Sequence, residues 1–248
     1  MRGNWAGTII VCILILGSLA FYTYGNSSNL SETTLESRYL IENLRGDTID
    51  TWKLWFIVED IALTVSIVNS ELVSQEKINA IKDSILSEES IEIDDSLQNK
   101  GPAGSTSVYY MGWKGALEQA SKHNTTFNIP SEFNIIESSK GVPDITIQLT
   151  NLKDTNGNSG YTKSITDGSQ ILKISITIYD VDSLTSENIA TITRHEFGHA
   201  LGLGHSTAPE DLMAQSIITS YPYISECDVD AIVSLYDNKK SSQVICEK

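Results

Sequence analysis

Three of the four histidines of this chain lie in one short stretch, HEFGHALGLGH at residues 195–205, which constrains the fold more than any other feature. His195 and His199 are four residues apart, so on a helix their rings project from one face, one turn apart. Gly202 favours the end of that helix because glycine adopts the left-handed conformation that ends many helices. The chain can then turn and bring His205 back toward the first two rings.

Three convergent imidazoles are a ligand set for catalytic zinc, which takes three protein ligands and keeps one position for water. The ion lowers the pKa of that water toward about 7, and a neighbouring carboxylate can accept its proton. Glu196 is adjacent to His195 in the sequence, beside the predicted ion but not on it. We therefore predict His195, His199 and His205 as ligands of one Zn²⁺, Glu196 as the general base, and no organic cofactor. The alternatives are histidines that cluster by accident and a zinc site without turnover.

The same spacing resembles the extended zinc-binding motif of the metzincin metalloproteases. Metzincins have a methionine turn beyond the third histidine, and HSTAPEDLMAQS (205–216) supplies Met213 there. The serine after the third histidine and the Leu-Met pair look like the matrixin branch, although matrixins commonly have proline where this chain has Gln215. The resemblance implies an α+β, zincin-like fold with a twisted, mostly parallel sheet, an antiparallel edge strand, an active-site helix and a C-terminal helix.

The resemblance extends, with lower specificity, over about residues 60–238. LTVSIVN (63–69) looks like the first strand of the matrixin domain, and ISITIYD (174–180) like the edge strand where a substrate could add as an extended strand. ISECDVDAIVSLYD (224–237) resembles the C-terminal helix. Tyr221 and Tyr223 follow the methionine turn, where matrixins build one wall of the specificity pocket; the two rings either line that pocket or only pack.

Local patterns predict further elements. Helical spacing in residues 74–86 and 108–123 predicts two helices, and alternation in residues 143–151 and 171–180 predicts two strands. The intervening segment 152–170 is rich in turn residues and is predicted to be a loop.

Three regions divide the chain. After Arg2 comes an apolar run, Thr8–Tyr24, so residues 1–25 are predicted to be a signal peptide or an N-terminal membrane anchor. Residues 26–58 are predicted to be a tether or N-terminal extension, in which Glu32–Asn43 is compatible with a short helix. Residues 59–248 form the predicted matrixin-like domain, with an acidic and Gly/Pro-broken insertion at about 87–107.

Two weaker features leave alternatives open. Cys227 and Cys246 are the only cysteines outside the apolar run, and in an oxidising compartment they could form a disulfide; otherwise they are free thiols. Asp154, Asn156 and Asn158 stand at alternate positions, as in a Ca²⁺-binding loop. The glycine is one place late and no glutamate follows at the twelfth position, which favours a plain turn.

Charge restricts the partners. The formal net charge is −15, a sign that repels phosphate backbones and excludes nucleic acid as an expected partner. The resemblance implies an exported zinc endopeptidase with protein or peptide substrates, either secreted or held at the membrane by the N-terminal segment. We expect a monomer and a prokaryotic source. Two alternatives are a catalytically silent, zinc-stabilised cell-surface module that binds peptides, and a metallohydrolase acting on a non-protein polymer of the envelope.

Overall fold

The computed structural model describes residues 35–39, 52–58, 61–98, 100–136, 141–239 and 241–246. The apolar run 8–24, on which the predicted signal or anchor depends, lies outside these residues. Within the described ranges, no helix is both long enough and apolar enough to cross a membrane.

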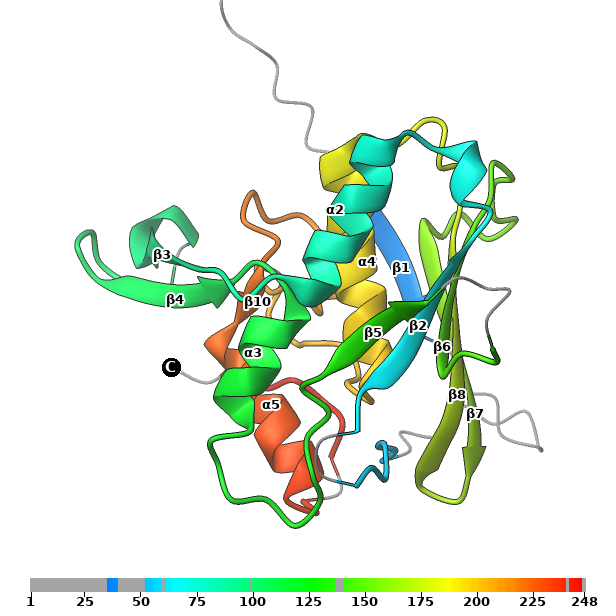
Figure 1. Cartoon of the computed structure of the whole chain (residues 1–248). Coiled ribbons are helices and arrows are strands. Elements are labelled where there is room, and N and C mark those ends of the chain that lie inside the picture. The colour runs from blue at the N-terminus through cyan, green and yellow to red at the C-terminus, as the bar shows by residue number, and fades with distance from the viewer. Residues whose placement is uncertain are drawn as a thin grey trace, which may run out of the picture. The chain divides into compact units, whose positions relative to one another are not determined.

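Ten strands and four α-helices are found in the described part of the chain (Figure 1). The strands are β1 (Leu35–Tyr39), β2 (Leu63–Val68), β3 (Ser90–Asp94), β4 (Thr106–Tyr110), β5 (Phe133–Ile136), β6 (Ile145–Leu149), β7 (Gly160–Asp167), β8 (Gln170–Ile178), β9 (Ser216–Ile217) and β10 (Ile224–Ser225). The helices are α2 (Gln75–Leu86), α3 (Trp113–Ala120), α4 (Ser186–Ala200) and α5 (Glu226–Tyr236), with short 3-10 turns at Ser70–Leu72 and Asp95–Gln98.

Seven strands form one sheet in the order β5-β2-β6-β8-β7-β1-β9. Strands β5, β2, β6 and β8 are parallel, with β5 at the edge of the sheet, whereas β7 runs antiparallel to β8. The isoleucines of β6 and β8 and Leu149 are buried, whereas Leu172 near the start of β8 is exposed. The predicted fold class, a mostly parallel sheet combined with an active-site helix and a C-terminal helix, is confirmed.

The assignment of the edge strand to residues 174–180 is wrong. The segment ISITIYD belongs to β8, which lies inside the sheet between β6 and β7. Strand β7 instead forms within the segment predicted to be a loop. Only Gly160 and Thr162 are buried in β7, so its sequence carries little of the apolar alternation by which a strand is recognised.

Strand β1 extends this sheet beyond β7, so the short helix considered for Glu32–Asn43 is also wrong. It pairs in parallel with β7, with Ser37 opposite Gly160 and Tyr39 opposite Thr162. On its other side β1 pairs antiparallel with β9, which follows the methionine turn. A segment of the N-terminal extension therefore lies between two strands that are far apart in sequence.

Helices α2 and α4 pack on the seven-stranded sheet, whereas α3 and α5 pack on each other and on strand β4. Helices α2 and α4 lie side by side, and α4 also contacts β7 and β8 (Figure 1). As predicted, α2 follows Ser74, whose hydroxyl accepts the Lys77 N–H. Helix α3 begins only at Trp113, and residues 108–110 of the predicted helix belong instead to β4.

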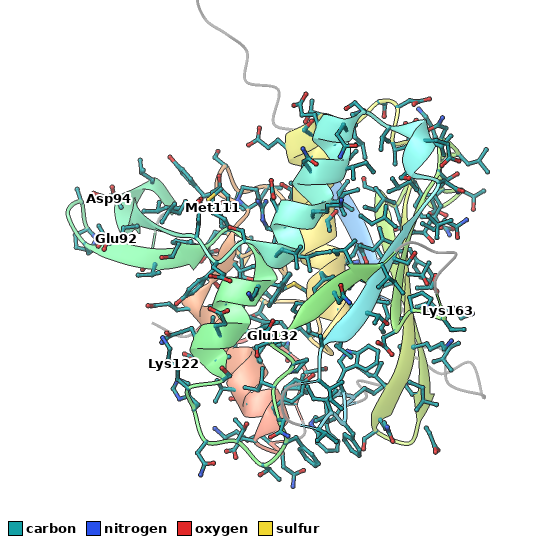
Figure 2. The ribbon with its side chains drawn as sticks, in the orientation of Figure 1. Glu92, Asp94, Met111, Lys122, Glu132 and Lys163 are labelled. Atoms are coloured by element: carbon teal, nitrogen blue, oxygen red, sulfur yellow. The ribbon has the colours of Figure 1, made fainter. Side chains whose placement is uncertain are left out.

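The segment predicted to be an insertion, together with the three residues after it, forms an antiparallel hairpin of β3 and β4, which projects from the rest of the described chain (Figure 1). Glu92 and Asp94 lie on this hairpin and Met111 at its base (Figure 2). Strand β10 joins the hairpin through Ile224 opposite Tyr110, making a second sheet of three strands. The domain boundaries themselves stay a prediction.

Candidate active site

Helix α4 carries two of the three clustered histidines. It starts at a capping box in which the Thr185 hydroxyl accepts the Asn188 N–H while the Asn188 side chain bonds back to Thr185. It ends at Leu201, and Gly202 follows with φ of 106°, as the sequence predicted. Every residue of α4 from Ile189 onward is buried, so the helix holds its polar side chains inside the protein.

The three predicted metal ligands converge. The Nε2 atoms of His195 and His199 are 3.1 Å apart, and the ring of His205 lies 4.8 Å from that of His199, centroid to centroid. One nitrogen from each of the three rings falls within 4.8 Å of the others. Two nitrogens bound at about 2.05 Å to one tetrahedral ion would be about 3.3 Å apart, so the first pair already has almost that separation.

Backbone carbonyls orient two of these rings. Nδ1 of His195 lies 2.7 Å from the carbonyl oxygen of Leu212, and Nδ1 of His199 lies 2.8 Å from that of Leu203. Because a carbonyl only accepts, each Nδ1 carries the proton and each Nε2 presents its lone pair to the centre of the cluster. The Nε2 of His205 is buried and has no hydrogen-bond partner in the described structure. A buried lone pair without a partner is what a metal ion would satisfy, so the residues fit zinc.

Burial keeps the three imidazoles neutral. It lowers the pKa of His195 to about 3 and that of His205 to about 4. The pKa of His199 falls well below its usual value, through burial first and then through its two histidine neighbours. Neutral imidazole is the form that binds metal, so the cluster needs no proton loss near neutral pH before it can take an ion.

Glu196 is on α4, and its fully buried side chain contacts β7. Its Oε2 accepts a hydrogen bond of 2.6 Å from the Thr162 hydroxyl. Gly160, two residues earlier on β7, leaves no room for a side chain, because a Cβ there would come within 2.5 Å of Oε1 of Glu196. The predicted base is therefore fixed against the backbone of β7, at the residues with which β1 pairs.

Met213 packs against α4 at Gly198, between the two helical histidines in sequence. It is fully buried, and a Cβ on Gly198 would come within 2.5 Å of its sulfur, so the methionine lies directly against α4. The turn that carries it is held by Asp211, whose Oδ1 accepts the Met213 N–H at 2.8 Å. The Met213 carbonyl in turn accepts the Ser206 N–H at 2.7 Å. The methionine turn is thus bonded to the residue that follows His205.

The two tyrosines differ in what they contact. The ring of Tyr223 lies under the Arg194 guanidinium, 5.1 Å from ring centroid to Cζ. The Arg194 Nε–H also donates to the Met111 carbonyl at the base of the hairpin. Tyr223 therefore packs against the start of the histidine motif, and Tyr221 is half-buried nearby. Their role as pocket walls stays a prediction.

The cysteines and the Ca²⁺-like loop contribute different chemistry. Cys227 and Cys246 are free thiols whose sulfur atoms lie within 4.8 Å of each other, so the disulfide stays a prediction.

In the loop that resembles a Ca²⁺ site, Oδ2 of Asp154 accepts the Asn156 N–H and the Asn158 side-chain N–H. Its carboxylate is thus already used to close the turn, which agrees with the plain-turn alternative.

Three features of the site are typical of a metzincin. They are the buried helix with His195, Glu196 and His199, the glycine turn that leads to His205, and the methionine turn at Met213. Comparison with known proteins identifies the branch: residues 132–237 match the family model of the matrixins. Residues 132–237 are therefore similar to the matrixin-type metzincins, a family of zinc metalloendopeptidases.

Two relatives illustrate the extent of the similarity. "Probable matrix metalloproteinase 095L" of Invertebrate iridescent virus 3 is 41% identical over 69 residues, which are 27% of this chain and 19% of that protein. "Matrix metalloproteinase-20" of Homo sapiens is 45% identical over 56 residues, 21% of this chain and 12% of that protein. The aligned regions thus span less than a fifth of either relative.

Sequence reasoning missed Thr162, Gly160 and Asp211. Thr162 and Gly160 lie on a strand that was predicted to be a loop, and no local signal links them to Glu196, which lies 34 residues beyond Thr162. For Asp211 a signal existed. It stands two residues before the turn methionine, at the distance where a carboxylate often accepts the backbone N–H of residue i+2.

Proposed function

We propose that this chain is a zinc-dependent endopeptidase in which His195, His199 and His205 hold the ion and Glu196 is the general base. The observation that carries the proposal is the convergence of three neutral imidazoles, in which the buried Nε2 of His205 has no partner. The buried carboxylate of Glu196 is the next residue after His195 on the helix. That combination suits the activation of water next to a peptide carbonyl.

The chain's own residues supply most of the chemistry. Bound zinc would acidify a water toward a pKa of about 7 and polarise the scissile carbonyl. Glu196 accepts the proton of the attacking water and then delivers it to the leaving amine. Thr162 holds the Glu196 carboxylate in place through a hydrogen bond to Oε2. The carbonyls of Leu212 and Leu203 keep the ligand rings in the tautomer that faces the ion.

The pairing of β1 supports a polypeptide as the substrate. An extended backbone segment pairs with β7 at Gly160 and Thr162, the two residues that contact Glu196. This edge of β7 therefore accepts an extended peptide strand beside the predicted base, as in recognition by strand addition. A non-protein envelope polymer has no regular backbone N–H and C=O groups with which to pair there. A silent peptide-binding module would have no use for Glu196.

Export and the division of the chain belong to the same proposal. Residues 1–25 would carry the chain out of the cytoplasm as a signal peptide or membrane anchor, 26–58 would be an N-terminal extension, and 59–248 the catalytic domain. The protein would then act outside the cytoplasm, as a monomer, on proteins or peptides. The predicted disulfide between Cys227 and Cys246 fits such a compartment. Calcium at Asp154 stays a minor prediction.

The test of the proposed function is metal-dependent cleavage of an unfolded protein. The zinc-loaded chain should cut peptide bonds, and a chelator should stop the cutting until zinc is restored. In His205→Ala the ion loses one of three protein ligands, so we expect both zinc content and cleavage to fall by at least about tenfold. His123→Ala is the matched control, because His123 is the one histidine outside the cluster and is exposed.

Zinc content is measured by elemental analysis of the purified proteins and cleavage by mass spectrometry of the products. A His205→Ala chain that keeps full zinc and full cleavage would remove His205 from the ligand set. A zinc-loaded wild type that binds unfolded chains without cutting them would leave the peptide-binding module as the function.

A further inference from the structure

The C-terminal segment Ser242–Cys246 lies alongside the loop that carries His205. The Gly204 N–H donates to the Ser242 carbonyl at 2.6 Å, and Ser206 pairs with Val244 in a parallel bridge. The side chain of Val244 is fully buried. Because Gly204 and Ser206 flank His205, the segment holds the backbone on both sides of the third predicted ligand.

The end of this segment also meets the methionine turn. The Cys246 thiol donates to Oδ2 of Asp211 over 3.5 Å, and Asp211 holds the Met213 N–H through its other oxygen. Cys227, in the first turn of α5, completes a cluster in which the ligand atoms of Asp211, Cys227 and Cys246 lie within 4.8 Å of one another. The two thiols therefore bring the C-terminal segment and α5 together next to Asp211, which holds the methionine turn.

These thiols are open to small molecules. A cavity of about 280 Å³ is lined by both cysteines together with Lys100, Tyr109 and Glu226, and both cysteines are only half-buried. The pKa of the Cys227 thiol is lowered, first by the neighbouring Cys246 side chain and also by Lys100, against burial and Asp211, which raise it. Cys227 is therefore the sulfur better suited to be the attacking thiolate.

We propose that the segment Ser242–Cys246 is a positioning element of the metal site, and that reversible disulfide formation between Cys227 and Cys246 sets how firmly it is held. The inference rests on the proposed function in one respect, namely that His195, His199 and His205 bind zinc. A second metal site at the same cluster is disfavoured, because the Asp211 oxygens already accept from the Met213 N–H and from the Ser225 hydroxyl.

The reaction needs an oxidant, which is a small-molecule disulfide such as oxidised glutathione. The Cys227 thiolate attacks one sulfur of that molecule, forms a mixed disulfide and expels one thiolate. Cys246 then loses its proton and its sulfur attacks the Cys227 sulfur, which expels the second thiolate. Two protein thiols are oxidised and the small disulfide is reduced to two thiols. The protein sulfurs must move from within 4.8 Å to about 2.05 Å.

Closing this bond would slow the release of zinc. We expect the ion to leave faster when the His205 loop can move away from the other two ligands, and that movement is opposed while the segment stays docked against Gly204 and Ser206. A disulfide closes the loop from Cys227 to Cys246 and so disfavours undocking of the segment. In the dithiol form only hydrogen bonds and the burial of Val244 hold it.

The experiment measures zinc dissociation into an excess of a chromogenic chelator, using the full chain with Cys12→Ser so that only the two relevant thiols remain. One sample is oxidised with glutathione disulfide, and the loss of two hydrogens is verified by mass. The other is kept reduced with a phosphine. We expect zinc to leave the oxidised protein at least about tenfold more slowly, given the stabilisation that disulfides of this loop length provide. Cys246→Ser should release zinc at the rate of the reduced protein whether or not the oxidant is added.

A second variant separates positioning from general stability. Val244→Ala weakens the docking of the segment without touching a histidine, so it should speed zinc release in the reduced protein. The disulfide should restore the slow release in the same variant, because it holds the segment independently of Val244. A variant that only loosened the fold would show no such rescue.

Three results would overturn the inference. They are equal zinc release rates with the disulfide verified, failure of the disulfide to form with glutathione disulfide, and a second zinc ion that is lost in Cys246→Ser. The proposed function has a separate readout, the Glu196-dependent cleavage of an unfolded protein. Redox-dependent zinc release in a chain that cuts nothing would support the inference and refute the endopeptidase, whereas redox-independent release in a chain that cuts would do the reverse.

Discussion

Glu196→Gln is expected to slow peptide hydrolysis by about 10²- to 10⁴-fold while leaving zinc bound, the usual range for loss of a general base. Glutamine has nearly the same shape, and its amide oxygen can still accept the hydrogen bond from the Thr162 hydroxyl, so the packing against β7 is kept. What is lost is an oxygen basic enough to take a proton from water. The measurement is kcat/KM on a fluorogenic peptide, with zinc content determined on the same samples.

Glu187→Gln is the matched control for this experiment. The same substitution is made on the same helix, but Glu187 is exposed in the first turn of α4, whereas Glu196 is buried near its end. Its kcat/KM should stay within about twofold of the wild type, as expected for a surface change. If Glu196→Gln keeps wild-type kcat/KM at full zinc occupancy, another group must take the proton.

Gly202→Ala should destabilise the protein by about 3 kcal/mol or more. Gly202 has φ of 106°, a conformation that costs a residue with a Cβ about 1–2 kcal/mol. The added Cβ would also overlap the carbonyl oxygen of Lys53, so one of two backbone segments must shift, at a further cost of about 1–3 kcal/mol. The free energy of unfolding is measured by urea denaturation of the zinc-free chain.

Gly157→Ala separates the two contributions. Gly157 also has positive φ, 83°, but a Cβ there would meet nothing within 4 Å. Its substitution should therefore cost only the backbone term of about 1–2 kcal/mol. If Gly202→Ala is no less stable than Gly157→Ala, the end of α4 and the segment around Lys53 adapt freely. The turn to His205 would then not be tightly fixed.

The sequence predicted the parts of the molecule that depend on local spacing. Helix α4, its end at Gly202 and the convergence of three histidines follow from residues within one short stretch, because helix geometry alone brings i and i+4 together. Strands β2, β6 and β8 and helix α5 followed for the same reason, since their apolar periodicity is strong. The predicted α+β class is accordingly confirmed, together with the resemblance to matrixins.

The parts that could not be predicted depend on pairing between distant segments. Strand β7 has polar residues on much of its length, and its identity as a strand comes from its neighbours β8 and β1. The contact of Thr162 with Glu196 exists only because β7 packs on α4. The β3–β4 hairpin was hidden by an acidic, glycine-broken sequence typical of loops. In each case the partner strand, which no local pattern encodes, decides the structure.

Strand β1 has a thermodynamic consequence for any molecule that is to pair with the same edge of β7. Because β1 belongs to the same chain, its pairing is intramolecular, and its occupancy does not fall when the protein is diluted. The competition is set by an effective concentration, which is of order millimolar for short flexible connections and falls as the connection lengthens. A free peptide must therefore reach a comparable concentration, or bind more tightly than Leu35–Tyr39, before it displaces that strand from beside Glu196.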